Sequence, residues 1–268
     1  MTHPGTLAPS AAGTAVEPAI RTVDLVKEFG GLKAVGGVSL AIPHGSVFGI
    51  LGPNGAGKTT FLNLVNGILP ATSGTILIRG EDATKSPAYK VARLGVARTF
   101  QTIKLVEGLT VAETIVGGRY RVRGDTVIGA ILALPSERRA RRESTERAHE
   151  LIRTVGLDVP PERLATSLSY GEQRRLEIAR ALASEPEILL LDEPTAGMNA
   201  RESAQLGELL LSLRESGLTL VMVEHNIALV RRYCTHAAVL SSGTLLIDGD
   251  PDECLDDPRV REAYFGTR

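Results

Sequence analysis

Residues 47–68 read VFGILGPNGAGKTTFLNLVNGI, and this stretch decides the fold of the chain. The apolar run Val47 to Leu51 predicts a buried parallel strand. The apolar residues between Phe61 and Ile68 follow helical spacing and predict an amphipathic helix. The segment between them fits the pattern G-x-x-x-x-G-K-[ST], which predicts a phosphate-binding loop. A glycine-rich turn with a chance lysine is the alternative, and the flanking strand and helix disfavour it.

The chemistry of this loop suits a nucleotide. Its glycines allow backbone N–H groups to close around phosphate oxygens, and the helix N-terminus adds partial positive charge. Lys58 is expected to reach the β- and γ-phosphates, and the hydroxyl of Thr59 to hold Mg²⁺. The residues expected to contact the nucleotide here are Gly52, Pro53, Asn54, Gly55, Ala56, Gly57, Lys58, Thr59 and Thr60.

The composition limits the remaining choices. A length of 268 residues suffices for one large α/β domain with a small addition, and the net charge of −1 gives no electrostatic case for nucleic acid. Cys234 and Cys254 lack metal-binding spacing, which favours reduced thiols. The longest apolar runs, such as Val127 to Leu134, are much shorter than the ~20 residues of a membrane span. With no signal peptide, a membrane role is expected to depend on partner subunits.

Basic residues cluster in two places, 119–123 and 138–142. Glutamates interleave the second cluster, so a solvated helix face is favoured over a nucleic-acid site.

The chain divides into a tail and one domain. Residues 1–18, rich in Ala, Pro, Thr, Ser and Gly, predict a disordered tail before a domain over 19–268. Strands are predicted at 20–29, 38–42 and 75–79 and assigned to an N-terminal antiparallel β subdomain. Helical periodicity dominates about 104–166, which predicts an inserted α-helical subdomain with helices at 111–116 and 136–155, the second capped by Ser136. The predicted class is α/β, with a mostly parallel sheet flanked by helices as in P-loop NTPases.

Polar residues follow several predicted strands. Gln101 follows the strand at 95–100, Asp192 and Glu193 follow 188–191, and His225 follows 218–223. The carboxyl ends of parallel strands line the ligand crevice of an open α/β sheet. Asp192 is then placed to hold Mg²⁺ through water, and Glu193 to polarise an attacking water. His225 is placed near the γ-phosphate. Solvent-facing carboxylates and a structural histidine are the alternatives, and the phosphate-binding loop disfavours them.

Two further features leave their roles open. Ser169 and Glu172 form the pattern S-x-x-E, a capping box at the start of a helix. Phe29 sits at a predicted turn, where its ring could stack on adenine or pack on its own sheet.

With these motifs the chain, from about Ile20 to its end, resembles ATP-binding cassette ATPase subunits. The resemblance implies that Glu193, His225 and Gln101 are catalytic and that Thr59, Gln101 and Asp192 hold Mg²⁺. It also implies that Phe29 and Val35 contact the ATP of the same chain. The signature, Leu168 to Gln173, would contact ATP held by a partner through Ser169, Gly171, Glu172 and Gln173. The chain departs from the family pattern at Tyr170, where glycine is commonest, and at Asn199, where the D-loop usually ends in aspartate.

Four segments resemble the ATPases of branched-chain amino acid importers: 30–35 (GGLKAV), 98–101 (RTFQ), 170–180 (YGEQRRLEIAR) and 257–266 (DPRVREAYFG). Similar subunits serve urea and short-chain amide importers and a lipopolysaccharide exporter. The resemblance implies a head-to-tail homodimer, or a heterodimer with a paralogue. It also implies membrane permease subunits, a solute-binding protein and a peripheral location at the cytoplasmic face of the inner membrane.

Two other classes remain as alternatives. Soluble cassette ATPases that act on ribosomes or DNA usually carry two cassettes or a coiled-coil insertion, whereas this chain has one cassette and a helical insertion. A P-loop kinase or GTPase is disfavoured by Glu193, the signature and His225, and by the absence of an N-K-x-D guanine motif.

Overall fold

The computed structural model describes residues 17–101, 103–119 and 135–265, with side chains omitted for 135–141 and 265. The predicted tail therefore lies almost entirely outside the described residues, as do Arg121 and Arg123 of the first basic cluster. Arg138, Arg139 and Arg141 of the second cluster are among the residues whose side chains are omitted. Arg142 is described, and its side chain is 81% exposed, as expected for a solvated helix face.

The N-terminal part forms the predicted antiparallel sheet, with strand order β2-β1-β4-β5. The strands are β1 (Ile20–Phe29), β2 (Leu32–Ile42), β4 (Ser73–Ile78) and β5 (Glu81–Asp82). Two of them begin earlier than the sequence predicted. Gly30 and Gly31, at φ of +52° and +91°, make a tight turn that lets β2 pair with β1 from Leu32 onward. Ser73, two residues before the predicted strand, pairs with Val26 and begins β4.

The second sheet has strand order β10-β9-β3-β8-β7-β6, and all its pairs except β9–β10 are parallel. Its strands are β3 (Val47–Leu51), β6 (Val96–Arg98), β7 (Ile188–Asp192), β8 (Thr219–Val223), β9 (His236–Ser241) and β10 (Thr244–Gly249). Every residue of β3, β7 and β8 is buried, as their short apolar runs predict. The α/β class with a mostly parallel sheet is confirmed.

The central strands bury both faces because their side chains alternate. One set of side chains, including Val47 and Leu189, packs with residues of helices α7 and α8. The other set, including Phe48 and Leu190, packs with helix α1 and the four-stranded sheet. These helices are α1 (Lys58–Val65), α7 (Tyr170–Leu182) and α8 (Ala200–Glu215). The sheet is thereby held between two apolar cores, with the phosphate-binding loop at the end of β3.

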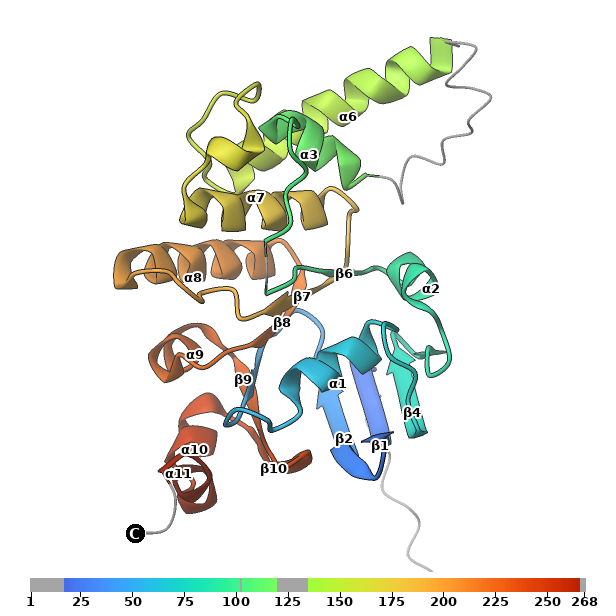
Figure 1. Cartoon of the computed structure of the whole chain (residues 1–268), viewed down its shortest axis with the longest axis vertical. Helices are drawn as coiled ribbons and strands as arrows, with labels where there is room; N and C mark the ends of the chain where they lie inside the picture. The colour runs from blue at the N-terminus through green and yellow to red at the C-terminus, as the bar shows by residue number, and fades with distance from the viewer. Residues whose placement is uncertain (1–16, 102, 120–134, 266–268) are drawn as a thin grey trace, which may run out of the picture.

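Two groups of helices lie at opposite ends of the molecule (Figure 1). Helices α3 (Val111–Gly117), α6 (Pro135–Thr154) and α7 group at one end, and α10 (Pro251–Asp256) and α11 (Pro258–Phe265) lie at the other. The other helical elements are α2 (Ala88–Arg93), η1 (Ala165–Ser167) and α9 (Ile227–Tyr233). Helix α6 begins at Pro135, so Ser136 lies in its first turn, and the prediction that Ser136 precedes and caps the helix is wrong. Proline is favoured at a first helical position because its missing N–H needs no partner there.

Candidate functional site

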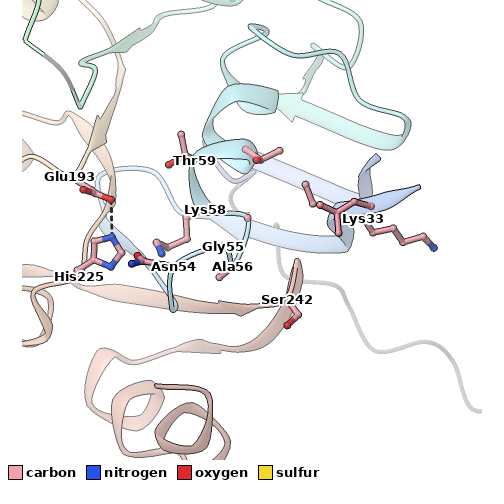
Figure 2. Close-up of a pocket in the computed structure, with 13 residues that line it drawn as sticks. Lys33, Asn54, Gly55, Ala56, Lys58, Thr59, Glu193, His225 and Ser242 are labelled. Carbon is pink, nitrogen blue, oxygen red and sulfur yellow. Dashed lines mark hydrogen bonds and ion pairs between the residues drawn. The ribbon is translucent and has the colours of Figure 1, made fainter. Parts of the chain in front are cut away.

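A cavity of about 440 Å³ opens where β3 ends and α1 begins. Figure 2 shows the phosphate-binding loop in this cavity, with Glu193 and His225 joined beside Lys58. The cavity contains most of the predicted loop together with residues that the sequence did not indicate. It is lined by Leu32, Lys33, Ala34, Asn54, Gly55, Ala56, Gly57, Lys58, Thr59, Thr60, Glu193, His225 and Ser242.

The shape of the loop depends on glycine at two positions. Gly52 has a φ of +144°, and a Cβ there would lie 2.1 Å from the carbonyl oxygen of Leu240. Gly57 has a φ of +96°, and its Cβ would lie 2.3 Å from the oxygen of Ala34. A side chain at either position would collide with backbone, so the glycines let the loop fold closely between its neighbours.

Lys58 is 6% exposed, and its ammonium donates to two carbonyls of its own loop. Its Nζ lies 2.7 Å from the oxygen of Gly52 and 2.9 Å from that of Pro53. Burial lowers the pKa of Lys58, and the charges of Glu193 and Asp192 oppose that shift. The first turn of α1 contains no acidic residue. A buried cation and a helix N-terminus therefore face the same space, which favours an anion such as a phosphate.

Asp192 ends β7 and is 3% exposed. One of its oxygens, Oδ2, accepts a hydrogen bond of 2.8 Å from Arg98, while Oδ1 lies 3.4 Å from the hydroxyl of Thr59. Arg98 also donates to Oδ1 of Asn63 at 2.7 Å. The hydroxyl and the carboxylate oxygen are the hard donors that Mg²⁺ prefers, so Thr59 and Asp192 fit a magnesium site.

Glu193 follows Asp192 and lies between two of the predicted catalytic residues. Its Oε2 accepts a hydrogen bond of 2.7 Å from Nε2 of Gln101, and its Oε1 lies 2.7 Å from Nε2 of His225. The backbone of Glu193 has a φ of +48°, a region that non-glycine residues rarely adopt. Such local strain is frequent at functional sites, and here it accompanies a fixed carboxylate at the cavity wall.

Glu224 is a residue of this region to which the sequence analysis assigned no role. Its side chain is buried, and Oε1 accepts hydrogen bonds from the backbone N–H of Thr195 (3.0 Å) and from its hydroxyl (2.7 Å). Its Oε2 accepts from the N–H of His225 at 3.1 Å. Glu224 thus ties the segment after Glu193 to the segment that carries His225. The only signal in the sequence was a glutamate directly after the apolar run at 218–223.

The signature residues do not line the cavity of their own chain. Ser169 caps α7, because its Oγ accepts a hydrogen bond of 3.5 Å from the backbone N–H of Glu172. The carboxylate of Glu172 accepts the N–H of Ser169 at 2.8 Å, which lowers its pKa. Gln173 donates to the carbonyl of Leu168 at 2.9 Å, and Gly171 packs against Glu202. The predicted capping box is confirmed.

Helix α7 is nevertheless joined to Gln101. The side chain of Arg174 is fully buried and donates to the carbonyl oxygens of Phe100 (2.7 Å) and Gln101 (2.9 Å). It also pairs with Glu177 at 3.1 Å, and burial raises the pKa of that carboxyl. The loop that carries Gln101 is therefore fixed to the helix that carries the signature.

Phe29 and Val35, the two residues outside the loop that were expected to contact the ATP of their own chain, do not line the cavity. Phe29 is 45% exposed but does not line the cavity, and the ammonium of Lys27 lies 4.9 Å from its ring centroid. Val35 is 0% exposed and packs in the core, and its contact with a nucleotide stays a prediction. The neighbouring residues Leu32, Lys33 and Ala34 line the cavity instead.

Within the described ranges, the helices are too short or too polar to cross a lipid bilayer.

The fold, the phosphate-binding loop and the carboxylates at the strand ends define a P-loop ATPase cassette. A family model for ABC transporters matches residues 35–196, and the chain belongs to this family of ATP-hydrolysing cassettes.

Relatives extend this match over nearly the whole chain. The high-affinity branched-chain amino acid transport ATP-binding protein BraF of Pseudomonas aeruginosa is 39% identical, over 93% of this chain and 98% of its own length. The corresponding protein LivG of Escherichia coli K12 is also 39% identical, with the same two coverages.

Solved structures agree with the fold. The ADP conformation of an ATP-binding cassette of an ABC transporter superposes with a TM-score of 0.81 at 31% identity, covering 93% of this chain and 99% of that one. A dimeric post-hydrolysis cassette bound to ADP and phosphate superposes with a TM-score of 0.71 at 26% identity, covering 87% and 98%.

Proposed function

We propose that this ATPase powers the import of branched-chain amino acids through membrane permease subunits that receive the solute from a binding protein. The observation that carries the substrate class is the identity to BraF and LivG, which extends over almost the full length of both proteins. Urea, short-chain amides and lipopolysaccharide are the other substrates of similar subunits, and the relatives found favour amino acids. The pair of ATPases acts at the cytoplasmic face of the membrane.

Within the cavity, the loop residues bind the phosphates of ATP. Lys58 exchanges the carbonyls of Gly52 and Pro53 for the β- and γ-phosphate oxygens, and the loop N–H groups surround the same phosphates. The hydroxyl of Thr59, Oδ1 of Asp192 and the side chain of Gln101 would hold Mg²⁺. Bound Mg²⁺ would offset the charge that develops on the phosphate oxygens.

Glu193 acts as the general base. One carboxylate oxygen orients the attacking water and accepts its proton, while the hydrogen bonds from Gln101 and His225 hold the carboxylate in place. His225 lies in the cavity lining, where it contacts the γ-phosphate. The proton passes to Glu193 as the water oxygen bonds to the γ-phosphorus and the bond from that phosphorus to the β–γ bridging oxygen breaks, which releases ADP and phosphate.

A second subunit completes the site. Ser169 and its neighbours in the signature lie outside the cavity of their own chain, so in a head-to-tail pair they contact the ATP of the partner. Such a pair is isologous, because each subunit gives the other the same surface. The dimeric cassette with ADP and phosphate supports the formation of a pair.

Transport by a strain that lacks this gene tests the substrate class. Uptake of labelled leucine is expected to fall to background and to return with the wild-type chain, but not with Lys58→Ala. Labelled urea, measured in parallel, is expected to be unaffected. Normal leucine uptake in the deletion strain, with loss of urea uptake, would assign the chain to the other importer class.

A further inference from the structure

The C-terminal helix reaches the phosphate-binding loop. Tyr264, near the end of α11, accepts a hydrogen bond of 2.8 Å on its hydroxyl oxygen from the backbone N–H of Gly52. The two residues are 212 positions apart in the chain. The proposed function assigns no task to α11, although Gly52 begins the loop that binds phosphate.

Gly52 is held at both of its backbone polar groups. Its N–H donates to Tyr264, and its carbonyl oxygen accepts the ammonium of Lys58 at 2.7 Å. The carbonyl of Leu240 in β9 approaches so closely that a Cβ at Gly52 would lie 2.1 Å from it. The first peptide of the loop therefore has little freedom while the Tyr264 hydrogen bond is present.

The ring of Tyr264 is positioned by packing, independently of that hydrogen bond. It packs on an apolar cluster that includes Leu51, Val230 and Val260, and burial raises the pKa of its hydroxyl. The phenol therefore remains uncharged at neutral pH. A second hydrogen bond reaches the same loop from the turn between β9 and β10, where the N–H of Gly243 donates to the carbonyl of Ala56 at 3.1 Å.

We propose that Tyr264 is a positioning residue of the nucleotide site. Its hydroxyl holds Gly52 so that the loop N–H groups and Lys58 are arranged for the phosphates before the nucleotide arrives. Preorganisation of this kind raises affinity by reducing the ordering that binding requires. The inference rests on the proposed role of the loop in binding ATP, and it makes the C-terminal helix part of the site.

Tyr264→Phe in the full chain tests this, because it removes one oxygen atom and keeps the packed ring. Affinities for Mg-ATP and Mg-ADP are measured by calorimetry, alongside steady-state ATPase kinetics. Since the hydrogen bond that holds Gly52 is lost, both affinities are expected to fall about 3- to 10-fold. The kcat at saturating ATP is expected to stay within about twofold, because Tyr264→Phe keeps the hydrogen bonds from Gln101 and His225 that hold Glu193. Tyr89→Phe, at a side chain 61% exposed on α2, is the matched control and is expected to bind as the wild type does.

Amide exchange separates positioning from general stability. The N–H of Gly52 is expected to exchange faster in Tyr264→Phe than in the wild type, while amides in β7 and β8 exchange as before. If the wild type binds Mg-ATP and Tyr264→Phe binds it with the same affinity, this inference is overturned while the proposed function stands. A lowered melting temperature with unchanged Gly52 exchange would also overturn it, because the role would then be structural. A wild-type chain that failed to bind Mg-ATP would overturn the proposed function as well.

Discussion

Nη2 of Arg98 lies 2.8 Å from Oδ2 of Asp192, and the two side chains are only 3% and 4% exposed. Arg98 comes from β6 and Asp192 from the neighbouring parallel strand β7. The pair leaves Oδ1 of Asp192 directed at the hydroxyl of Thr59. One cation thus compensates a buried carboxylate while the other oxygen of that carboxylate remains available at the cavity.

Arg98→Met is expected to lower the free energy of unfolding by about 3–5 kcal/mol, because it leaves the charge of Asp192 buried and uncompensated. The double variant Arg98→Met, Asp192→Asn removes both charges and is expected to recover a large part of that loss. Urea denaturation of the two variants and of Asp192→Asn completes the cycle. If the free energy of unfolding of Arg98→Met falls by less than about 1 kcal/mol, water rather than Arg98 compensates the charge of Asp192.

Glu193→Gln is expected to reduce ATP turnover by about 10²-fold or more while ATP binding persists. Glutamine keeps the size of Glu193 and can still bond to Gln101 and His225 after rotation of its amide, but it cannot accept the proton. The variant is expected to accumulate as an ATP-bound dimer, measured by ATPase assay and size-exclusion chromatography. Glu208→Gln, at a glutamate 61% exposed on α8, is the control. Hydrolysis by Glu193→Gln at nearly the wild-type rate would exclude Glu193 as the base.

Local patterns predicted the centre of this fold well. The strands β3, β7 and β8 are short apolar runs between turn residues, and burial on both faces gives this pattern. The capping boxes at Ser169 and Asn199 also follow from a local rule. The start of β2 was missed because its first half lacks an apolar run and includes Gly36 and Gly37.

Long-range contacts account for what the sequence did not indicate. Ser242 lines the cavity only because the β9–β10 hairpin lies beside the loop, where Gly243 donates to Ala56. Arg98 was expected only as part of a family pattern, since its partner Asp192 is 94 positions away. The burial of Val35 depends on how β2 packs on β1 and α1. None of these relationships has a local sequence signal.

The two cysteines are expected to be nearly inert in the folded chain. Burial raises the pKa of Cys254 to about 11 and raises that of Cys234 as well. At about pH 8 a thiol with a pKa near 11 is only about 0.1% thiolate, the form that reacts with iodoacetamide. Labelling of Cys254 should therefore rise about tenfold for each unit of pH up to about pH 10. Both cysteines should label rapidly in concentrated urea. Mass spectrometry assigns the sites, and rapid labelling of the native chain at about pH 8 would contradict the prediction.

Ser169 is predicted to do two jobs, which substitution can separate. As the cap of α7 its oxygen accepts the N–H of Glu172, and as a signature residue its hydroxyl would donate to ATP held by the partner. Aspartate caps as well as serine but carries a negative charge that opposes phosphate. In this structure Ser169 Oγ donates to Glu172 Oε2 at 2.8 Å, so an aspartate at 169 would meet that carboxylate. Glu172→Gln removes the repulsion and keeps a capping box.

In the Glu172→Gln background, Ser169→Asp is expected to keep the free energy of unfolding within about 1 kcal/mol. ATP should still bind at Lys58 of the same chain, because Ser169 lies outside that cavity. ATP-driven dimerisation, followed by size-exclusion chromatography with Glu193→Gln added, and ATPase activity without it should both be lost. The same pair of exchanges at the capping box of α3, Thr110→Asp with Glu113→Gln, places the charge on another helix and should preserve both. If the Ser169→Asp chain still dimerises with ATP, its hydroxyl does not contact the partner's nucleotide, and Ser169 serves only as a cap.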